Sequence, residues 1–261
     1  MAKVRRHVGI FSLTALVLVS VFAIAQTAGA QQQNAPPSPW MQFTIVSIDP
    51  PMADEYVALQ RDIGARIRRG QNAPAWRIVG RFDVFGDNYQ FLTITPVQNL
   101  ASFDARNADA ELAVLNSRAQ RYIKGQQSYG IRMVTDLANP LPERTAPAML
   151  LINMAKVMPG REQDYLNLMK TDFLPHFDKA EFRHLTGTLT FGDESRFVHM
   201  FYINNFAKLD EGSPVVRALG PDAAQKVNAK MAGIVTGNES WTVRIVPDLS
   251  YGPWSPPASR Q

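Results

Sequence analysis

One pattern of hydrophobic and polar positions occurs twice along the chain. Residues 76–87 open with an aromatic residue and an arginine, continue in β-branched and aromatic residues, and close on Phe-Gly-Asp. Residues 182–193 repeat this order 106 positions later. In each copy a second apolar run, 89–95 or 197–203, follows the glycine turn, an arrangement that is typical of a β-hairpin. The sequence therefore predicts the same hairpin twice.

Strands and helices around the first hairpin complete a six-element unit. Residues 43–46 form an expected strand, and Asp49-Pro50-Pro51 then begins a helix whose apolar positions, within 56–67, recur every three or four residues. After the hairpin, we expect a second helix that ends at Gly125 and a strand over 129–134. The order strand, helix, strand, strand, helix, strand is the ferredoxin-like pattern.

The second unit follows the same order. Residues 149–152 are an apolar run that suits a central strand, and the helix that opens at Pro159-Gly160 should kink or end at Pro175. The closing strand is expected over 241–246. The expected segments are a signal peptide at 1–30, a proline-rich lead-in at 31–40, repeat 1 at 41–140, a linker at 141–147, repeat 2 at 148–250 and a tail at 251–261. The fold class is therefore α+β, with two tandem ferredoxin-like repeats.

The first thirty residues are typical of a secretory signal peptide. Three basic residues precede an apolar run at 8–25, and Ala28-Gly29-Ala30 supplies the small residues that a signal peptidase recognises. We expect cleavage after Ala30. The alternative is an uncleaved membrane anchor, because about 18 apolar residues just span a bilayer. The favoured interpretation is an exported bacterial protein, periplasmic or secreted, with no stable membrane insertion after cleavage.

Charge and cysteine content narrow the expected partners. Removing the signal segment leaves 24 basic residues against 23 acidic ones, so the mature chain is nearly neutral. It lacks the basic stripe that phosphate backbones require, and nucleic acid is not an expected partner. The chain has no cysteine, which excludes disulfides and thiolate metal ligands. Core packing must therefore hold the fold together.

The two units resemble the dimeric α/β-barrel superfamily over residues 41–250. The likeness rests on the prolines ahead of Glu55-Tyr56 and Asp164-Tyr165, on the Phe-Gly-Asp hairpins and on the terminal Pro247 to Ser250. Within the superfamily the chain is most similar to NIPSNAP-like and antibiotic-biosynthesis-monooxygenase-like bacterial proteins. The resemblance implies that two antiparallel sheets pair edge to edge into a barrel, with helices outside and a ligand cavity within. Here both sheets would come from one chain, as a fused α/β barrel.

The resemblance also bears on the edge strands and on cofactors. Pairing of the two sheets would place the edge strand with Trp76 against the edge strand with Trp241, and the converse. Members of the superfamily include cofactor-independent monooxygenases, haem-binding enzymes, isomerases and proteins without a known reaction. The haem branch uses a histidine on a helix, and His176 is the helical candidate here. No cofactor is expected.

The second hairpin carries the candidate ligand-binding residues. If Phe191 lies opposite Arg196, the paired residue numbers sum to 387, which places the two strand histidines four residues apart and too far from each other to share a metal ion. One face of the hairpin is polar and aromatic, as a ligand pocket is, whereas the other is apolar and suits packing under helices. The candidate residues on the first face are His184, Thr186, Thr188, Phe197, His199 and Phe201. The alternative is that this face is only a hydrated barrel interior.

The first hairpin offers fewer candidates, and no motif names a reaction. Arg81 and Tyr89 are further possible ligand contacts, although Arg81 with Asp83 also suits an ion pair at the surface or seam. The chain has no glycine-rich phosphate loop, serine nucleophile elbow or zinc-binding helix. We therefore carry three hypotheses. The first is an exported protein that binds a small molecule, with or without catalysis.

The other two hypotheses belong to different classes. A cofactor-independent monooxygenase acting on a small hydrophobic or aromatic compound would need a snug pocket and a base, which a tuned histidine supplies. A structural or assembly protein would use exposed sheet edges to pair with further copies of itself. In each case a homo-oligomer is compatible with the sequence.

Overall fold

The computed structural model describes residues 40–70, 73–82, 89–106, 109–141, 145–191 and 196–253. The chain divides into residues 1–37 and residues 38–261, and the second part holds every described element. The expected signal segment lies outside the described residues, as does all but the last residue of the proline-rich lead-in. Both Phe-Gly-Asp turns also fall largely outside them.

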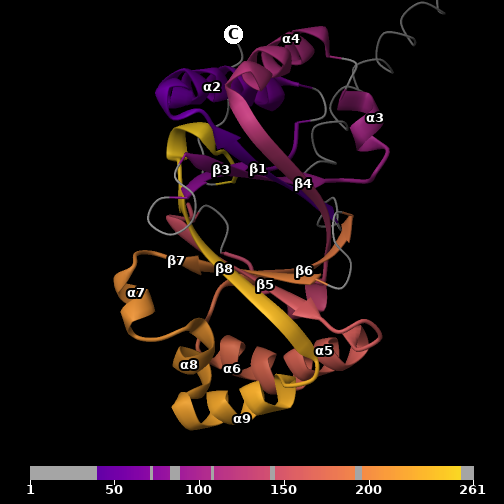
Figure 1. The fold of residues 1–261 in the computed structure, drawn as a ribbon, viewed down its shortest axis with the longest axis vertical. Helices are drawn as coiled ribbons and strands as arrows, with labels where there is room; N and C mark the ends of the chain where they lie inside the picture. Colours follow the sequence, from indigo (N-terminus) through magenta and orange to yellow (C-terminus); the bar gives the residue numbers. More distant parts are fainter. Residues whose placement is uncertain are drawn as a thin grey trace, which may run out of the picture. The chain divides into compact units, whose positions relative to one another are not determined.

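Eight antiparallel strands of the described residues close into a barrel, in the order β1-β3-β2-β8-β5-β7-β6-β4 (Figure 1). The strands are β1 (Trp40–Ile48), β2 (Ile78–Phe82), β3 (Gln90–Val97), β4 (Ile123–Met133), β5 (Met149–Val157), β6 (His184–Phe191), β7 (Arg196–Ile203) and β8 (Val235–Ile245). Each repeat supplies four neighbouring strands in the ferredoxin-like order. The predicted fold class, an α+β chain with a fused barrel, is confirmed.

The two repeats are joined at two seams by their edge strands. At one seam β8 pairs with β2, with Gly80 opposite Ile245, and at the other β4 pairs with β6, with Ile131 opposite Leu189. The Val243 side chain of the other repeat packs closely on Gly80, where an added Cβ atom would lie 2.1 Å from Val243 Cγ1. The predicted pairing of the two sheets is confirmed, and the first seam requires a glycine at this position.

A short segment after each closing strand crosses to the other repeat. After β4 and the turn η4 (Thr135–Leu137), Asn139 pairs with His184 through two backbone hydrogen bonds of 2.9 and 2.7 Å. After β8 and the turn η6 (Pro247–Leu249), Tyr251 pairs with Arg77 in the same way, at 2.8 and 2.7 Å. The crossings are reciprocal, so each repeat holds the end of the other.

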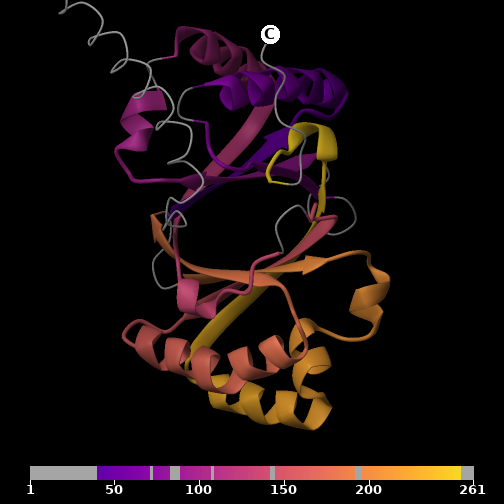
Figure 2. The ribbon, with the colours of Figure 1, turned by 180° about the vertical axis from the view of Figure 1, so that it is seen from behind.

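Helices cover the barrel on two opposite sides (Figures 1 and 2). The first repeat contributes η2 (Pro50–Met52), α2 (Ala53–Arg69), α3 (Ser102–Arg106), α4 (Ala110–Ala119) and η3 (Gln120–Tyr122). The second contributes α5 (Glu162–Leu168), the π-helical turn η5 (Met169–Phe173), α6 (Leu174–Lys179), α7 (Ala207–Asp210), α8 (Pro214–Leu219) and α9 (Pro221–Met231). In α2 the stripe Tyr56, Leu59 and Ile63 is buried, as its spacing predicts.

Three expected element boundaries differ from the structure. Gly125 does not end a helix, because β4 begins at Ile123 and includes it, and β8 likewise starts six residues before the expected 241. These strand starts are exposed and polar, so they carry no alternation of apolar residues, and pairing with β1 and β5 decides their conformation. Of the kink or end expected at Pro175, the end is wrong: a π-helical turn precedes the proline and α6 continues to Lys179.

The barrel interior is a packed hydrophobic core built by both repeats. Its members are at most 7% exposed and are Met41, Phe43, Ile78, Phe82, Leu92, Ile94, Ile131, Leu150, Ile152, Met154, Leu189, Val198, Met200, Val243 and Ile245. Full burial of each such side chain contributes roughly 1.5–3 kcal/mol. The expected ligand cavity inside the barrel was therefore wrong for the described residues.

Candidate functional site

The second hairpin has a register that differs from the expected one. His184 lies opposite Phe201, Thr186 opposite His199 and Thr188 opposite Phe197, so paired numbers sum to 385 instead of 387. The two histidines are therefore two positions apart along the strands, where four were expected. The pairing of β6 with β7 ends at Thr188, while on its other edge β6 pairs with β4 from Gly187 to Phe191 through a bulge, which the turn motif alone could not indicate.

The polar face of this hairpin points toward the helices, which is opposite to its expected direction. Phe197 and Phe201 belong to the core between the sheet and the helices of repeat 2, whereas Val198 and Met200 point into the barrel. The ring of His184 packs against Phe177 of α6, with centroids 5.3 Å apart. Both faces of the sheet are buried, so strand alternation identifies the two faces without showing which one faces the helices.

His199 is the centre of a buried hydrogen-bond network. Its Nε2 lies 2.7 Å from the Tyr165 hydroxyl and its Nδ1 lies 3.0 Å from Thr186 Oγ1. Burial lowers the pKa of His199 to about 3, with a smaller contribution from His184, and burial raises the pKa of Tyr165. The imidazole is therefore neutral at physiological pH and bridges two hydroxyl groups, which makes it a poor proton acceptor.

The other expected contacts lie apart from this network. Thr188 donates to the Arg132 carbonyl across the seam, at 3.4 Å. Arg81 is exposed on β2 and lies opposite Arg244, and its expected ion-pair partner lies outside the described residues. Tyr89 is 44% exposed and has a left-handed backbone, with φ 63°, just before β3. None of these residues lines the pocket described next, so the structure does not gather the expected set into one site.

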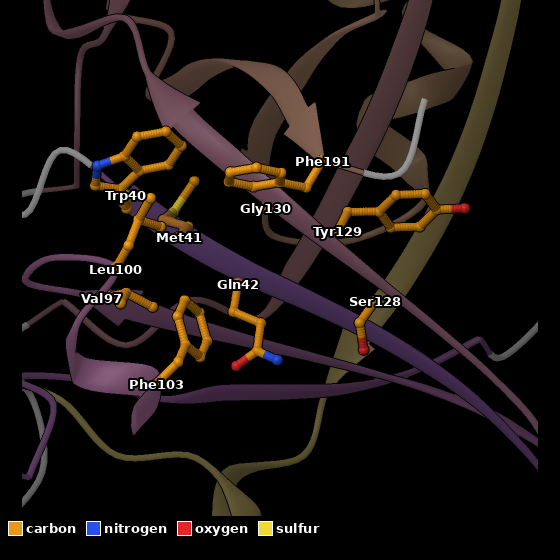
Figure 3. A pocket seen from close by; sticks show the side chains of 10 residues that line it. All are labelled: Trp40, Met41, Gln42, Val97, Leu100, Phe103, Ser128, Tyr129, Gly130 and Phe191. Atoms are coloured by element: carbon orange, nitrogen blue, oxygen red, sulfur yellow. The ribbon is translucent and has the colours of Figure 1, made fainter. Parts of the chain in front are cut away.

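A pocket of about 330 Å³ lies on the outer side of the first repeat's sheet, beside the seam. It is lined by Trp40, Met41 and Gln42 of β1, Val97 of β3, Leu100 and Phe103 around α3, Ser128, Tyr129 and Gly130 of β4 and Phe191 of β6 (Figure 3). Most of these side chains are apolar and four are aromatic. The lining contains no Asp, Glu, Lys, Arg or His. Such a site suits a small uncharged ligand.

An aromatic pair from both repeats forms one wall of the pocket. The rings of Trp40 and Phe191 are stacked, with centroids 6.1 Å apart and planes 25° apart. The bulge between Gly130 and Ile131 places Phe191 over Gly130, and a Cβ atom at that glycine would lie 2.6 Å from the Phe191 ring. Phe103 lies across from this pair and Gln42 and Ser128 add polar groups (Figure 3).

The matching position of the second repeat is filled. Gln42 pairs with Gly130 in the first repeat, and Leu151 pairs with Thr242 in the second. Thr242 is 5% exposed, and Leu151 packs against the core under the helices. Sequence reasoning missed the pocket, although the signal was present: a glycine in one repeat stands where the other has a branched side chain.

The described residues offer little for a metal ion or a haem group. They contain no group of three metal-ligating side chains, and none of their helices is long and apolar enough to cross a membrane. His176 of α6, the helical candidate for haem, is exposed, while Phe173 and Phe177 on the same helical segment are buried and fill the space against the sheet. The residues of this helix therefore do not fit a haem group between helix and sheet.

Comparison with known proteins shows the fold and no closer relationship. No family profile and no curated protein sequence matches the chain. Among solved structures, a candidate monooxygenase from Fusobacterium nucleatum is 7% identical, with a TM-score of 0.62 over 81% of this chain and 94% of that one.

Two further structures are similar over most of their length. A candidate monooxygenase from Lactobacillus acidophilus is 10% identical, with a TM-score of 0.59 over 83% of this chain and 97% of that one. A heme-binding protein from Thermus thermophilus is 11% identical, with a TM-score of 0.51 over 82% of this chain and 96% of that one. At these identities the likeness establishes the fold alone, and this chain has the dimeric α/β-barrel fold in fused form.

Proposed function

We propose that this protein binds a small apolar or aromatic compound in the pocket between β1, β4, α3 and Phe191. The observation that carries the proposal is the pocket itself: about 330 Å³ lined by aromatic and aliphatic side chains, in a protein whose barrel interior is filled. Ligand sites typically measure roughly 300–1,000 Å³ and combine an apolar lining with a few polar groups. We also propose that the chain is related to NIPSNAP-like proteins in particular.

The test of binding compares alanine variants at matching positions of the two repeats. N-phenyl-1-naphthylamine, a neutral dye, is titrated into the protein and its fluorescence gain measured. Phe103→Ala is expected to weaken binding by about tenfold, because one aromatic contact contributes on the order of 1 kcal/mol or more. Leu209→Ala, at the matching position of α7, should leave binding unchanged, since Leu209 lines no part of this pocket. Equal dye affinity in both variants would place binding elsewhere.

The second candidate function is oxygen-dependent oxidation of the bound compound. It is supported by the neighbours described as candidate monooxygenases and only at the level of the fold. Because His199 is buried and neutral, it is a weak base, and binding without catalysis remains the stronger proposal. An oxygen electrode separates the two functions, since catalysis would consume oxygen when a bound aromatic compound is added and binding alone would not.

The protein is also proposed to act outside the cytoplasm, on the basis of its first thirty residues. The mature chain is expected to begin at Gln31, because Ala28-Gly29-Ala30 supplies the small residues before the cleavage point. Intact-mass measurement of protein from the native host checks this. Recovery of the full chain from the membrane fraction, with Met1 retained, would instead support the anchor.

A further inference from the structure

We infer that the pocket selects uncharged, flat aromatic rings that carry one hydrogen-bonding group at an edge, and that Gly130 keeps the site open for them. The inference rests on the proposed function and names the ligand class of that same site. It also predicts one ligand site per chain, although the fold is duplicated.

The flat shape of the ligand follows from the aromatic walls. The rings of Trp40 and Phe191 are stacked with their planes 25° apart, so both rings are oriented in nearly the same way. Phe103 lies on the other side of the pocket (Figure 3). Aromatic pairs prefer offset-stacked or edge-to-face contact, and a planar ring makes both kinds of contact where a branched aliphatic compound makes neither.

The polar edge of the ligand follows from Gln42 and Ser128. The Gln42 amide carries two N–H donors and one acceptor oxygen, and this side chain lines the pocket (Figure 3). The Ser128 hydroxyl lies 3.1 Å from Thr44 Oγ1 and keeps further hydrogen-bonding capacity. A hydroxyl or carbonyl substituent on the ring would meet these groups on the Gln42 side of the pocket.

Because no charged side chain lines the pocket, charged ligands are disfavoured there. The one ionisable side chain among the lining residues is Tyr129, and its hydroxyl donates to Gln127 Oε1 at 3.0 Å. A carboxylate or ammonium group entering this lining would lose hydration without gaining an opposite charge, which is costly. The pocket should therefore discriminate strongly between a phenol and a carboxylate on the same ring.

Gly130 controls the space available to the ligand. Gly130 lies in β4 and does not have a positive φ, so the glycine is needed for room and not for an unusual dihedral angle. A Cβ atom here would press on the Phe191 ring at 2.6 Å and move it from its position beside Trp40. The second repeat has Thr242 at this position and is filled there, which is why one site per chain is expected.

Three matched probes test the ligand class: naphthalene, 2-naphthol and 2-naphthoate, titrated into the full mature chain by calorimetry or tryptophan fluorescence. The native protein should bind 2-naphthol about tenfold more tightly than naphthalene, with 2-naphthoate weakest and one site per chain. Gln42→Leu, which copies Leu151 of the second repeat, should remove the preference for 2-naphthol and leave naphthalene affinity unchanged.

The glycine is tested by two alanine variants of the same strand. Gly130→Ala should weaken 2-naphthol and naphthalene alike by about tenfold or more, as displacement of one aromatic wall would. Gly125→Ala is the matched control, because its Cβ would have no atom within 4 Å, and it should leave affinity unchanged. Circular dichroism and thermal unfolding check folding, and if Gly130→Ala does not fold, Gln42→Leu still decides the ligand class.

The outcomes separate the inference from the proposed function. Equal affinity for naphthalene and 2-naphthol, with loss of both in Gly130→Ala, would overturn the selectivity while the site stands. Tightest binding of 2-naphthoate would also overturn it. If no probe binds, or if Gly130→Ala and Phe103→Ala both bind like the native protein, the proposed function itself is wrong.

Discussion

Replacing Arg77 by alanine is expected to lower the free energy of unfolding by about 3 kcal/mol. Arg77 is 3% exposed, and its guanidinium donates to the Leu249 carbonyl at 2.9 Å and to Gln60 Oε1 at 2.8 Å. The variant leaves both buried acceptors without a partner, at roughly 1–3 kcal/mol each, and opens a cavity. It also removes the side chain that holds the end of the second repeat against the first.

One effect opposes this loss. Burial lowers the pKa of Arg77, which shows that taking the cation out of water is costly, and alanine recovers that cost. We expect the loss to exceed the recovery, because two hydrogen bonds and the packing of the long side chain disappear together. Arg183→Ala is the matched control, since Arg183 is only half-buried and contacts Asn139 Oδ1 at the equivalent crossing.

Urea unfolding of both variants measures the difference. The midpoint for Arg77→Ala should fall well below that of the native protein, whereas Arg183→Ala should lose no more than about 1 kcal/mol, as partly exposed groups do. A larger loss at Arg183 than at Arg77 would show that burial does not decide which crossing holds the repeats together.

The second large effect is a loss of stability in weak acid that His199 causes. Its pKa is about 3 in the folded protein and 6.5 as the ordinary value, so between these pH values the unfolded chain binds a proton that the folded protein does not. Stability is therefore complete above pH 6.5 and falls as the pH is lowered toward 3. The full difference corresponds to at most about 5 kcal/mol.

A variant isolates this contribution. Burial also lowers the pKa of His184, so this residue too makes the protein less stable as the pH falls. The pKa values of carboxylates such as Asp109 and Asp172 are lowered as well, and these groups reduce stability at lower pH. His199→Gln keeps a hydrogen-bonding side chain between Tyr165 and Thr186 but does not titrate. Its unfolding free energy, measured from about pH 7 to 4.5, should depend less steeply on pH than that of the native protein. Parallel curves would mean that the pKa of His199 in the folded protein is close to its ordinary value.

Much of the architecture could be predicted from local pattern. The repeated aromatic-arginine opening and the Phe-Gly-Asp closing gave two hairpins, and the structure shows a further reason for the arginine. Arg77 and Arg183 each hold the segment that crosses from the other repeat. The resemblance to the dimeric α/β-barrel superfamily predicted the closed barrel correctly, and closure pairs the edge strands of the two repeats with each other.

Positions along the strands were less predictable. The second hairpin's register was wrong by two. On its other edge β6 pairs through a bulge with β4, a strand of the other repeat that lies far away in the sequence. Its parity was right, so His184, Thr186 and His199 do share one face. Which face met the helices could not be inferred, since apolar residues occupy both sides of a sheet that is covered on both.

The sequence by itself determined the duplicated strand and helix order, the composition of each sheet face and the absence of a catalytic motif. Only the tertiary structure decided that the barrel interior is full and that a pocket opens on the outer side of one repeat. Periodicity reports how residues alternate within one element, whereas a cavity depends on which elements approach each other and how closely. Gly130 shows the difference: it is an unremarked strand residue in the sequence, and contact with Phe191 of the other repeat makes it the residue that keeps the site open.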